Sequence, residues 1–392
     1  MNTKTIKSVC KIFIIFMLFA TGCWDRTEIN DIALITASAY DLVPEGGIRY
    51  TIQLMLPSAG GAKSGQGGSG GSKKTDFIVE TAVGADVGEA EKNIQKRFPR
   101  KLFRGHRRVI VIGEDLAKNG MGEILDSVSR DPQNRLRTNV LVAEGISGCD
   151  LLKIDYPLER VPAEAMREMT QIGIGIEANI RDFLIAKSSQ GIQPIGVSIS
   201  PRNNKEGFDE TGIAVFKDMQ LAGYLKGEEI EGYLWVTGKF KNSTITTPVP
   251  GKEGMIRINV KNTNAKITPE IEGNKVNIYI DLKGEGSVYG NSTQLDLSIP
   301  KNIVLTQEAV KDKIKNIVQN TVQLAQKEYK SDIFGFGSII SQHNAKEWKL
   351  LRESWDDAFS DVKVFVSIDF KIRTSGMSGL PLYLDESEGD GK

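Results

Sequence analysis

Cys23 and the two residues before it, Thr21 and Gly22, are the residues whose chemistry is easiest to assign. The chain begins with a segment that contains lysines and no acidic residue. A run of nine apolar residues, 12–20, comes next and leads to these three residues. Nine apolar residues are too few to span a bilayer, which takes about 20, but they suit the core of a signal peptide. A cysteine directly after such small residues is the acceptor pattern of a bacterial lipoprotein. We therefore expect a signal peptide at 1–22, cleavage between Gly22 and Cys23, and a diacylglyceryl group on the Cys23 thiol. The alternative is an ordinary secretory signal, or a buried strand, with an incidental cysteine.

Elsewhere the chain offers few side chains that could carry catalysis. It has two histidines, His106 and His343, and no two His or Cys residues fall at metal-ligand spacing. No nucleophile motif such as G-x-S-x-G occurs. We expect no catalytic residue, no metal and no cofactor, and therefore no enzyme. We expect His106, which precedes an apolar strand, to be a buried structural histidine. Cys149 is the one thiol that remains after cleavage and lipidation, and we expect it to be a small buried apolar residue rather than a nucleophile.

Two glycine-rich stretches resemble nucleotide-binding motifs but lack their context. Residues 173–178 fit the dinucleotide pattern G-x-G-x-x-A, yet they follow a helix-like segment where the motif needs a strand. Residues 58–74 are crowded with Gly and Ser but contain no Gly-Lys-Ser/Thr, so they do not form a phosphate-binding loop. Such a composition buries too little apolar surface to offset its ordering entropy, and we expect a disordered loop there.

The overall composition indicates a globular protein without a nucleic-acid partner. The 392 residues include 50 basic and 50 acidic side chains, and cleavage of the signal peptide leaves a net charge of −3. A nearly neutral chain lacks the basic surface that nucleic-acid binding requires. About 370 mature residues exceed one typical core, so two or three domains are expected. Beyond the signal peptide no apolar run has membrane-spanning length, so we expect lipid alone to hold the body at a membrane.

Strand and helix patterns alternate through the first half of the mature chain. This alternation predicts an N-terminal α/β region at 23–205, in one or more domains, with a boundary at the polar stretch 201–205. Four strands are expected at 32–40, 48–56, 107–112 and 137–143, and a further strand is expected to begin at residue 77. Helices are expected at 86–97, 114–130, near 149, 163–170 and 180–188.

The second half, 206–378, predicts a different arrangement. A hairpin at 212–225, a short helix at 228–236, alternating strands and a long helix at about 307–329 precede a closing strand at 362–372. The long helix has an apolar stripe on one side, and apolar residues alternate along the closing strand. This order indicates an α+β domain with the helix on an antiparallel sheet. Trp348, Trp355 and Phe359 fall at spacings that place them on one helix face, which we expect to be buried against the sheet. We expect the acidic tail, 379–392, to be disordered.

Several short motifs together resemble one family. Gly22-Cys23-Trp24-Asp25, with Glu28-Ile29-Asn30 close behind, is similar to the start of the C-subunit lipoproteins of spore germinant receptors, the GerAC family. The other matching segments are His106 with 109–112, Arg130-Asp131 followed by Arg135, 212–217 with Leu221 and Gly223, and Gly335-Phe336-Gly337 with Trp348, Trp355-Asp356 and Phe359. Residues 35–41, where glycines would be expected before the aspartate, and the long Gly/Ser loop depart from the family pattern and indicate a divergent subgroup.

The resemblance implies a three-domain mixed α/β fold and a non-enzymatic receptor subunit. Members of the family sit on the outer face of the spore's inner membrane beside two polytopic partner subunits, and the receptor responds to nutrients such as amino acids or sugars. The resemblance does not imply that this subunit itself binds a small-molecule nutrient. The main alternative is a solute-binding lipoprotein of an importer, which predicts two similar βα lobes around a cleft. A hydrolase of the cell envelope would need a nucleophile that the sequence lacks.

Overall fold

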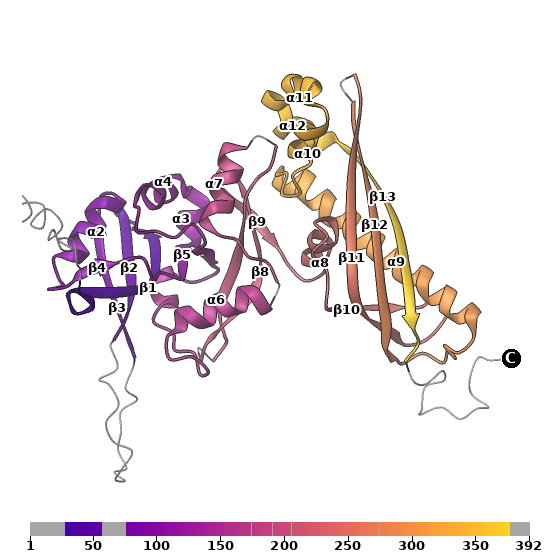
Figure 1. Cartoon of the computed structure of the whole chain (residues 1–392), viewed down its shortest axis with the longest axis horizontal. Coiled ribbons are helices and arrows are strands. Elements are labelled where there is room, and N and C mark those ends of the chain that lie inside the picture. The colour runs from indigo at the N-terminus through magenta and orange to yellow at the C-terminus, as the bar shows by residue number, and fades with distance from the viewer. Residues whose placement is uncertain are drawn as a thin grey trace, which may run out of the picture.

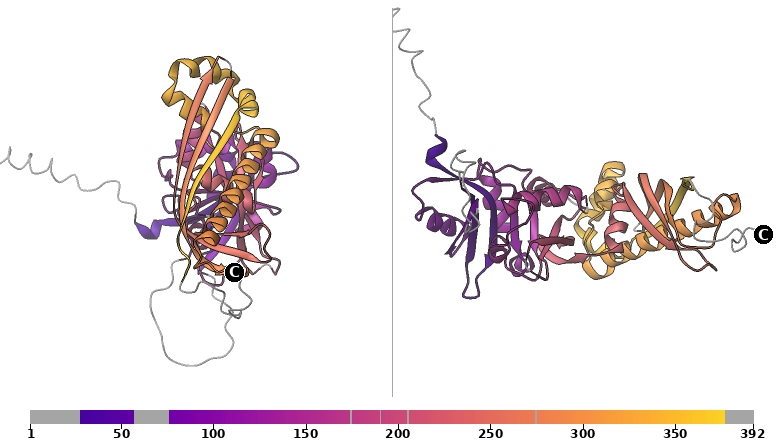
Figure 2. Two further views of the ribbon diagram at one scale, coloured as in Figure 1. Left: turned by 90° about the vertical axis from the view of Figure 1, so that its right-hand side faces the viewer. Right: turned by 90° about the horizontal axis from the view of Figure 1, so that it is seen from below.

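The computed structural model describes residues 28–56, 76–173, 175–189, 191–204, 206–273 and 275–376. The signal peptide with Gly22 and Cys23, the Gly/Ser loop at 58–74 and the tail at 379–392 lie outside these ranges. Two lobes follow one another along the long axis of the molecule, the first in indigo to magenta and the second in orange to yellow (Figures 1 and 2). Each lobe is built around its own sheet.

The first lobe is built on a nine-stranded mixed sheet. Eight strands follow the order β3-β2-β1-β5-β6-β7-β8-β9, and β4 pairs with β1. The centre of the sheet is parallel, from β1 through β5 and β6 to β7, while both ends are antiparallel. Every residue of β5 and β6 is buried, as expected for parallel strands covered on both faces. The strands are β1 (Ile32–Leu42), β2 (Ile48–Met55), β3 (Phe77–Gly84), β4 (Lys101–Phe103), β5 (Val109–Gly113), β6 (Asn139–Ala143), β7 (Ile195–Pro201), β8 (Phe208–Lys217) and β9 (Gln220–Leu225).

Helices cover both faces of this sheet and create two separate cores. α2 (Val87–Gln95), α3 (Glu114–Asn119), α4 (Gly122–Arg130) and α7 (Ile180–Ser188) bury apolar side chains in one core. α5 (Gly148–Leu151) and α6 (Pro162–Ile172) do so in the other. The predicted start of α2 is confirmed, because the Asp86 carboxylate accepts the Glu89 amide at 2.8 Å and caps the helix.

One local prediction for the first lobe was wrong, and the hairpin predicted at 212–225 forms but joins the first sheet. The single helix expected at 114–130 is broken between α3 and α4, where Gly120 has a φ of +118° and ends the first helix. The hairpin β8–β9, expected to open the second domain, instead extends the first sheet because β8 pairs antiparallel with β7. The first sheet therefore continues past residue 205 to Leu225.

The second lobe is a four-stranded sheet with one long helix across a face (Figure 1). Its strands follow the order β10 (Ser243–Pro248), β11 (Met255–Glu272), β12 (Lys275–Asn291) and β13 (Lys363–Thr374). The helix α9 (Pro300–Leu324) begins earlier than predicted and continues into a π-helical turn, Ala325–Tyr329. Its predicted apolar stripe faces the sheet, with Val310, Ile314 and Ile317 buried. The α+β class is thereby confirmed.

The predicted sheet of the second lobe needs one correction. β10, β11 and β12 are antiparallel as expected, but β13 pairs parallel with β12. The chain leaves β12, returns through α9 and a group of short helices, and only then enters β13, so β13 runs in the same direction as β12. Residues at alternate positions of β13 still face the helix, as their spacing predicted.

The aromatic residues near the C-terminus are buried as predicted, but not on one helix. Trp348 lies on α11 (Ala345–Leu351), whereas Trp355 and Phe359 lie on α12 (Trp355–Asp361) after an intervening 3-10 turn. The two indole rings meet edge to face at 5.5 Å. Together with α10 (Phe336–His343), these helices form a compact group at the end of the second sheet that is nearer the first lobe (Figure 1).

The contact between α8 (Glu228–Val236) and α9 depends on a glycine, which gives a first prediction. A Cβ atom on Gly232 would overlap the Thr321 hydroxyl and lie 3.0 Å from the Ile317 carbonyl oxygen. We expect Gly232→Ala to lower the free energy of unfolding by about 1–3 kcal/mol, because the two helices must separate. Urea denaturation followed by tryptophan fluorescence measures this, since Trp235, Trp348 and Trp355 all lie in the second lobe.

Gly122→Ala is the matched control for this substitution. Gly122 is also helical, and no atom lies within 4 Å of the place that its Cβ atom would take. We expect this change to leave stability unchanged or to raise it by up to about 1 kcal/mol. Equal midpoints for the two variants would contradict the close contact between α8 and α9.

Candidate functional site

The two lobes meet through backbone and side-chain hydrogen bonds at the end of α9. The Tyr329 hydroxyl donates to the Tyr224 carbonyl oxygen at 2.8 Å. The Ser331 hydroxyl donates to the Phe216 carbonyl oxygen at 2.6 Å. In the opposite direction, the Gln193 amide donates to the Asp332 carbonyl oxygen at 2.8 Å. These bonds attach the last residue of the π-helical turn and the segment after it to β8, β9 and the segment before β7 of the first lobe. We call this region the interlobe joint.

The Asp332 side chain organises the second-lobe half of the interlobe joint. Its carboxylate accepts the backbone amides of Gly335, Phe336 and Gly337 at 2.9, 3.1 and 2.9 Å. It also accepts the Trp355 indole N–H at 3.0 Å. Burial raises the pKa of the Asp332 carboxyl to about 6, although all four donors act to lower it. One carboxylate therefore fixes the start of α10 and the position of α12.

Two glycines bring the lobes into direct backbone contact. A Cβ atom on Gly337 would lie 2.6 Å from the Gly191 Cα of the first lobe and 2.6 Å from the Trp355 Nε1. The Ser338 amide donates to the Gly191 carbonyl oxygen at 2.9 Å across this contact. Gly335 has a φ of +74°, a conformation that glycine adopts without strain. The Gly335-Phe336-Gly337 motif thus serves the packing of the interlobe joint.

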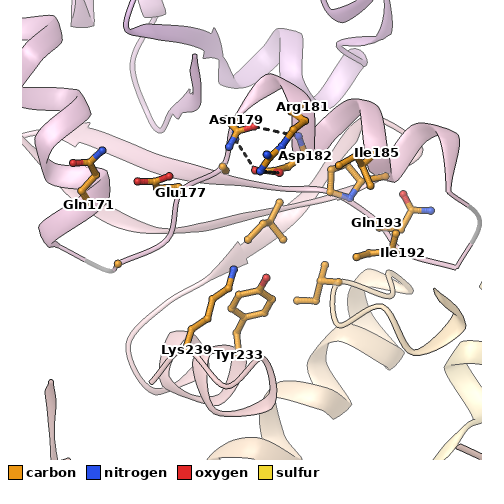
Figure 3. Close-up of a pocket in the computed structure, with 16 residues that line it drawn as sticks. Gln171, Glu177, Asn179, Arg181, Asp182, Ile185, Ile192, Gln193, Tyr233 and Lys239 are labelled. Carbon is orange, nitrogen blue, oxygen red and sulfur yellow. Dashed lines mark hydrogen bonds and ion pairs between the residues drawn. The ribbon is translucent and has the colours of Figure 1, made fainter. Parts of the chain in front are cut away.

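A cavity of about 520 Å³ lies beside the interlobe joint. Its first-lobe wall comes from the segment between α6 and α7, from α7 itself and from residues 192–195. Tyr233, Lys239 and Ile333 contribute the second-lobe wall. Figure 3 shows Lys239 and Tyr233 extending toward the wall that carries Asn179, Arg181 and Asp182. A volume of this size and a mixed lining are typical of small-molecule sites.

The polar groups in this cavity differ in how they are satisfied. Asn179 and Asp182 form the capping box of α7, and Arg181 approaches Asp182 at 3.4 Å. Burial, and secondarily the nearby Asp182 carboxylate, raises the pKa of the Tyr233 phenol above its usual range. Lys239 and Glu177 have no side-chain hydrogen-bond or ion-pair partner among the residues that the structure describes. Both side chains are exposed, so water solvates their charges at the mouth of the cavity.

A second polar cluster lies inside the first lobe, and it corrects the prediction for His106. The His106 side chain is exposed and meets the edge of the Phe103 ring at 6.1 Å between centroids, whereas Arg107 is 2% exposed. The Arg107 guanidinium donates to the hydroxyl groups of Ser38 and Tyr40 at 3.3 and 3.4 Å and to the Asn134 side-chain oxygen at 2.8 Å. The arginine takes the interior position because acceptors are present there.

A salt bridge lies next to this cluster. Arg104 approaches the Glu91 carboxylate at 3.0 Å, and burial raises the Glu91 pKa against the opposing effect of Arg104 and Arg107. Each guanidinium of the cluster thus has an acceptor or a carboxylate partner through its terminal nitrogens, while the Nε atoms of Arg104 and Arg107 are buried without one. The arrangement is that of a stabilising core network, and its residues do not line the cavity beside the interlobe joint.

The remaining sequence-predicted residues lie in structural positions. Cys149 is buried, as predicted, on α5, whose N-terminal amides at Gly148 and Cys149 donate to the Asp41 carboxylate at 2.7 and 2.9 Å. Within the described ranges no cluster of His, Cys, Asp and Glu could hold a metal ion. The G-x-G-x-x-A stretch joins α6 to α7, so it lacks the strand that a dinucleotide site needs. Neither Asp332 nor Lys239 was predicted from the sequence, although the Gly-x-Gly after Asp332 was an available signal of close packing.

Comparison with known proteins agrees with this architecture of two dissimilar lobes on a mixed α+β fold. The family model described as Spore germination protein N-terminal domain matches residues 25–200, and the one described as Spore germination B3/GerAC like, C-terminal, matches residues 211–376. YfkR, a Bacillus subtilis (strain 168) protein named for spore germination, is 30% identical over 93% of this chain and 95% of its own length. Spore germination protein KC of the same strain is 24% identical over 95% of this chain and 96% of its own.

A solved structure shows the same fold. The crystal structure of the GerBC protein superposes with a TM-score of 0.58 at 21% identity, over 86% of this chain and 96% of that one. The chain therefore belongs to the GerAC family of spore germination proteins, the C subunits of germinant receptors, and has a role in spore germination. The family resemblance deduced from the sequence is confirmed.

The raised pKa of Asp332 gives a prediction for pH dependence. Its unfolded value lies near 3.9 and its folded value is raised to about 6, so the folded state binds the proton more tightly. The stabilising contribution of the protonated carboxyl is complete below pH ~4 and is lost as pH rises toward 6. Relative to Asp332→Asn, which stays neutral, the wild-type free energy of unfolding should fall by on the order of 2–3 kcal/mol between pH 4 and pH 7.

Urea denaturation of both proteins across this range, followed by tryptophan fluorescence, measures the difference. Subtracting the variant removes the contribution of other titrating carboxyl groups that the two proteins share. A difference that stays constant from pH 4 to pH 7 would show that Asp332 keeps an ordinary pKa in the folded protein.

The buried arginine gives a second prediction for this region. Arg107→Met leaves Ser38, Tyr40 and Asn134 without their shared donor, so we expect a loss of about 3–5 kcal/mol in the free energy of unfolding. His106→Gln, at the neighbouring exposed position, should change stability by less than about 0.5 kcal/mol. Thermal unfolding followed by far-UV circular dichroism compares the two, and a larger effect of His106→Gln would contradict the assignment.

Proposed function

We propose that this protein is the lipid-anchored C subunit of a nutrient germinant receptor, which acts by assembly with polytopic membrane subunits rather than by catalysis. The observation that carries the proposal is the family match in two consecutive segments, 25–200 and 211–376, directly behind the predicted lipoprotein signal. The relatives share nearly their full length with this chain, as the 95% coverage of YfkR illustrates.

Attachment to the outer face of the inner spore membrane would be through Cys23. No helix in the described part of the chain is long and apolar enough to cross a bilayer. The first strand begins at Ile32, nine residues after Cys23. Nine residues reach at most about 30 Å, so an anchor at Cys23 would keep the β1 end of the first lobe close to the membrane. There it could contact the extracytoplasmic surface of polytopic partners.

The importer alternative fits the structure less well. A solute-binding lipoprotein of an importer would have two similar βα lobes, but the two sheets here have nine and four strands and different topologies. The polar groups that a hydrolase would need are also spread apart: His106 is exposed, Cys149 is buried on α5, and His343 lies on α10 in the other lobe. These positions support a non-enzymatic subunit.

The lipid anchor is tested directly by mutation. We expect Cys23→Ala to abolish incorporation of radiolabelled palmitate and to leave the signal peptide uncleaved at this site, because the diacylglyceryl group with its two acyl chains is attached to the Cys23 thiol. Cys149→Ala, which removes a buried thiol, is the matched control and should still be labelled. Label on the Cys23→Ala protein would refute the assignment.

Spore physiology tests the receptor assignment separately. Spores that carry only the Cys23→Ala protein should fail to respond to their receptor's nutrient, yet should germinate when dipicolinate bypasses the receptor. Growing cells should take up the same nutrient at an unaltered rate. Slow uptake combined with normal germination would instead identify an importer component.

A further inference from the structure

α6 has apolar residues on two of its faces. On one face, Ala163 and Met166 are fully buried in the core that α5 and α6 form with the first sheet. On the other face, Ala165, Met169 and Ile172 follow at spacings of four and three residues, which align them along the helix. This second stripe runs from Ala165, which is buried, to Ile172, which is 80% exposed. A helix on the surface of a globular protein normally has one apolar face, so the second stripe extends beyond what the core requires.

A groove of about 580 Å³ lies along this second stripe. The rest of its lining comes from the segment between α5 and α6 and from the start of β8. Leu158 in that segment is 86% exposed, so two large aliphatic side chains, Leu158 and Ile172, border one groove in contact with water. Scattered exposed apolar residues are common on proteins, whereas several that line one groove are typical of an interaction site.

Aromatic packing holds one wall of this groove in place. The Tyr156 ring packs on the ring of Phe208 at 4.9 Å between centroids, and Phe208 is fully buried. The Arg202 guanidinium lies over the Tyr156 ring at 5.5 Å from its centroid. A wall that is already fixed binds a partner without the entropic cost of ordering its own side chains.

The charges that line this groove have one sign. Among the described residues of the lining, every charged side chain is a carboxylate, and these are Glu159, Glu168, Asp209 and Glu210. Arg167 forms an ion pair with Glu168, and Arg202 approaches Asp209 at 2.8 Å. These two arginines neutralise part of the charge, and the rim keeps an excess of carboxylates. A surface of matching chemistry combines apolar groups with Lys or Arg side chains.

The excess of carboxylates selects among possible occupants. In a two-fold dimer of this chain, the acidic rim would face the same rim of the second copy, so like charges would meet. A surface of anionic lipids would be repelled by the same carboxylates. A helix with an apolar stripe and basic flanks instead matches both the apolar lining and the acidic rim, because amphipathic helices bind grooves through side chains one helical turn apart.

We propose that this groove binds an amphipathic helix of another protein. The apolar stripe of that helix packs on Leu158 and Ile172, and its Lys or Arg side chains contact the carboxylates of the rim. The bound helix lies beside α6, where the small Ala165 side chain allows a close approach of the two helices. Binding of such a helix is a property of the groove alone. That the helix belongs to a polytopic subunit of a germinant receptor rests on the function proposed above.

Photocrosslinking of the full chain in sporulating cells tests the proposal. Benzoylphenylalanine is introduced at Leu158, at Ile172 and, as a control, at Leu350, which is 83% exposed on α11 of the second lobe. We expect the first two positions, and not Leu350, to give an adduct with a peptide that has apolar residues at helical spacing beside Lys or Arg, as mapped by mass spectrometry. Adducts only with lipid, with a second copy of this chain or with a segment that lacks basic residues overturn the proposal. The absence of an adduct, or an equal yield of the same adduct at Leu350, also overturns it.

Reversal of one charge on the rim tests the electrostatic part of the proposal. Glu159→Lys should lower the yield of the Ile172 adduct at least about threefold, because the basic flank of the helix then meets a like charge. Glu347→Lys, at an exposed position on α11, should leave the yield unchanged. Equal yields in the two variants overturn the proposed contact with the acidic rim. The adduct is measured without nutrient and without germination, whereas palmitate labelling and the response of spores report on the receptor assignment, so the two failures are distinguishable.

Discussion

The Asp332 carboxylate accepts three backbone amides and an indole N–H, and the backbone carbonyl of the same residue accepts the Gln193 amide of the first lobe. A single residue thus fixes the start of α10, the position of Trp355 and one bond between the lobes. Removing a buried acceptor leaves its donors without partners, which costs about 1–3 kcal/mol for each group. The geometry of the interlobe joint therefore depends on this one side chain more than on any single apolar contact around it.

The positions of the aromatic residues in the C-terminal lobe also depend on Asp332. Trp355 is held by Asp332, Trp348 packs on Trp355, and Gly337 approaches both rings and the backbone of Gly191. No Cβ atom fits at Gly337. The spacing of these glycines and tryptophans in the sequence therefore follows from one requirement, the close packing of Gly337 against Gly191 and the two indole rings. These aromatic residues are interior groups that set the angle between α10, α12 and the first lobe, rather than an exposed surface for a partner.

The periodicity of apolar residues predicted helices and strands well where local sequence alone determines them. The alternation along β13, the stripe on α9 and the start of α7 are local patterns, and each is confirmed. The parallel direction of β13 and the place of the hairpin β8–β9 in the first sheet were not predictable, because both depend on where the chain returns in space. His106 was misjudged for a related reason: the acceptors that favour a buried Arg107 beside it come from β1 and from the loop after α4.

Lys239 and Glu177 illustrate why the candidate site could not be found in the sequence. They are separated by more than sixty positions, and neither belongs to a motif. The two residues line one cavity only because the interlobe joint brings the two walls of the cavity together. The proposed anchor and the family motifs are short-range signals, because a peptidase or a close packing contact would constrain only neighbouring residues. A cavity between lobes is instead a consequence of how Asp332, Gly337 and Gly191 position one lobe on the other, so a change at the joint should alter the cavity without touching its charged groups.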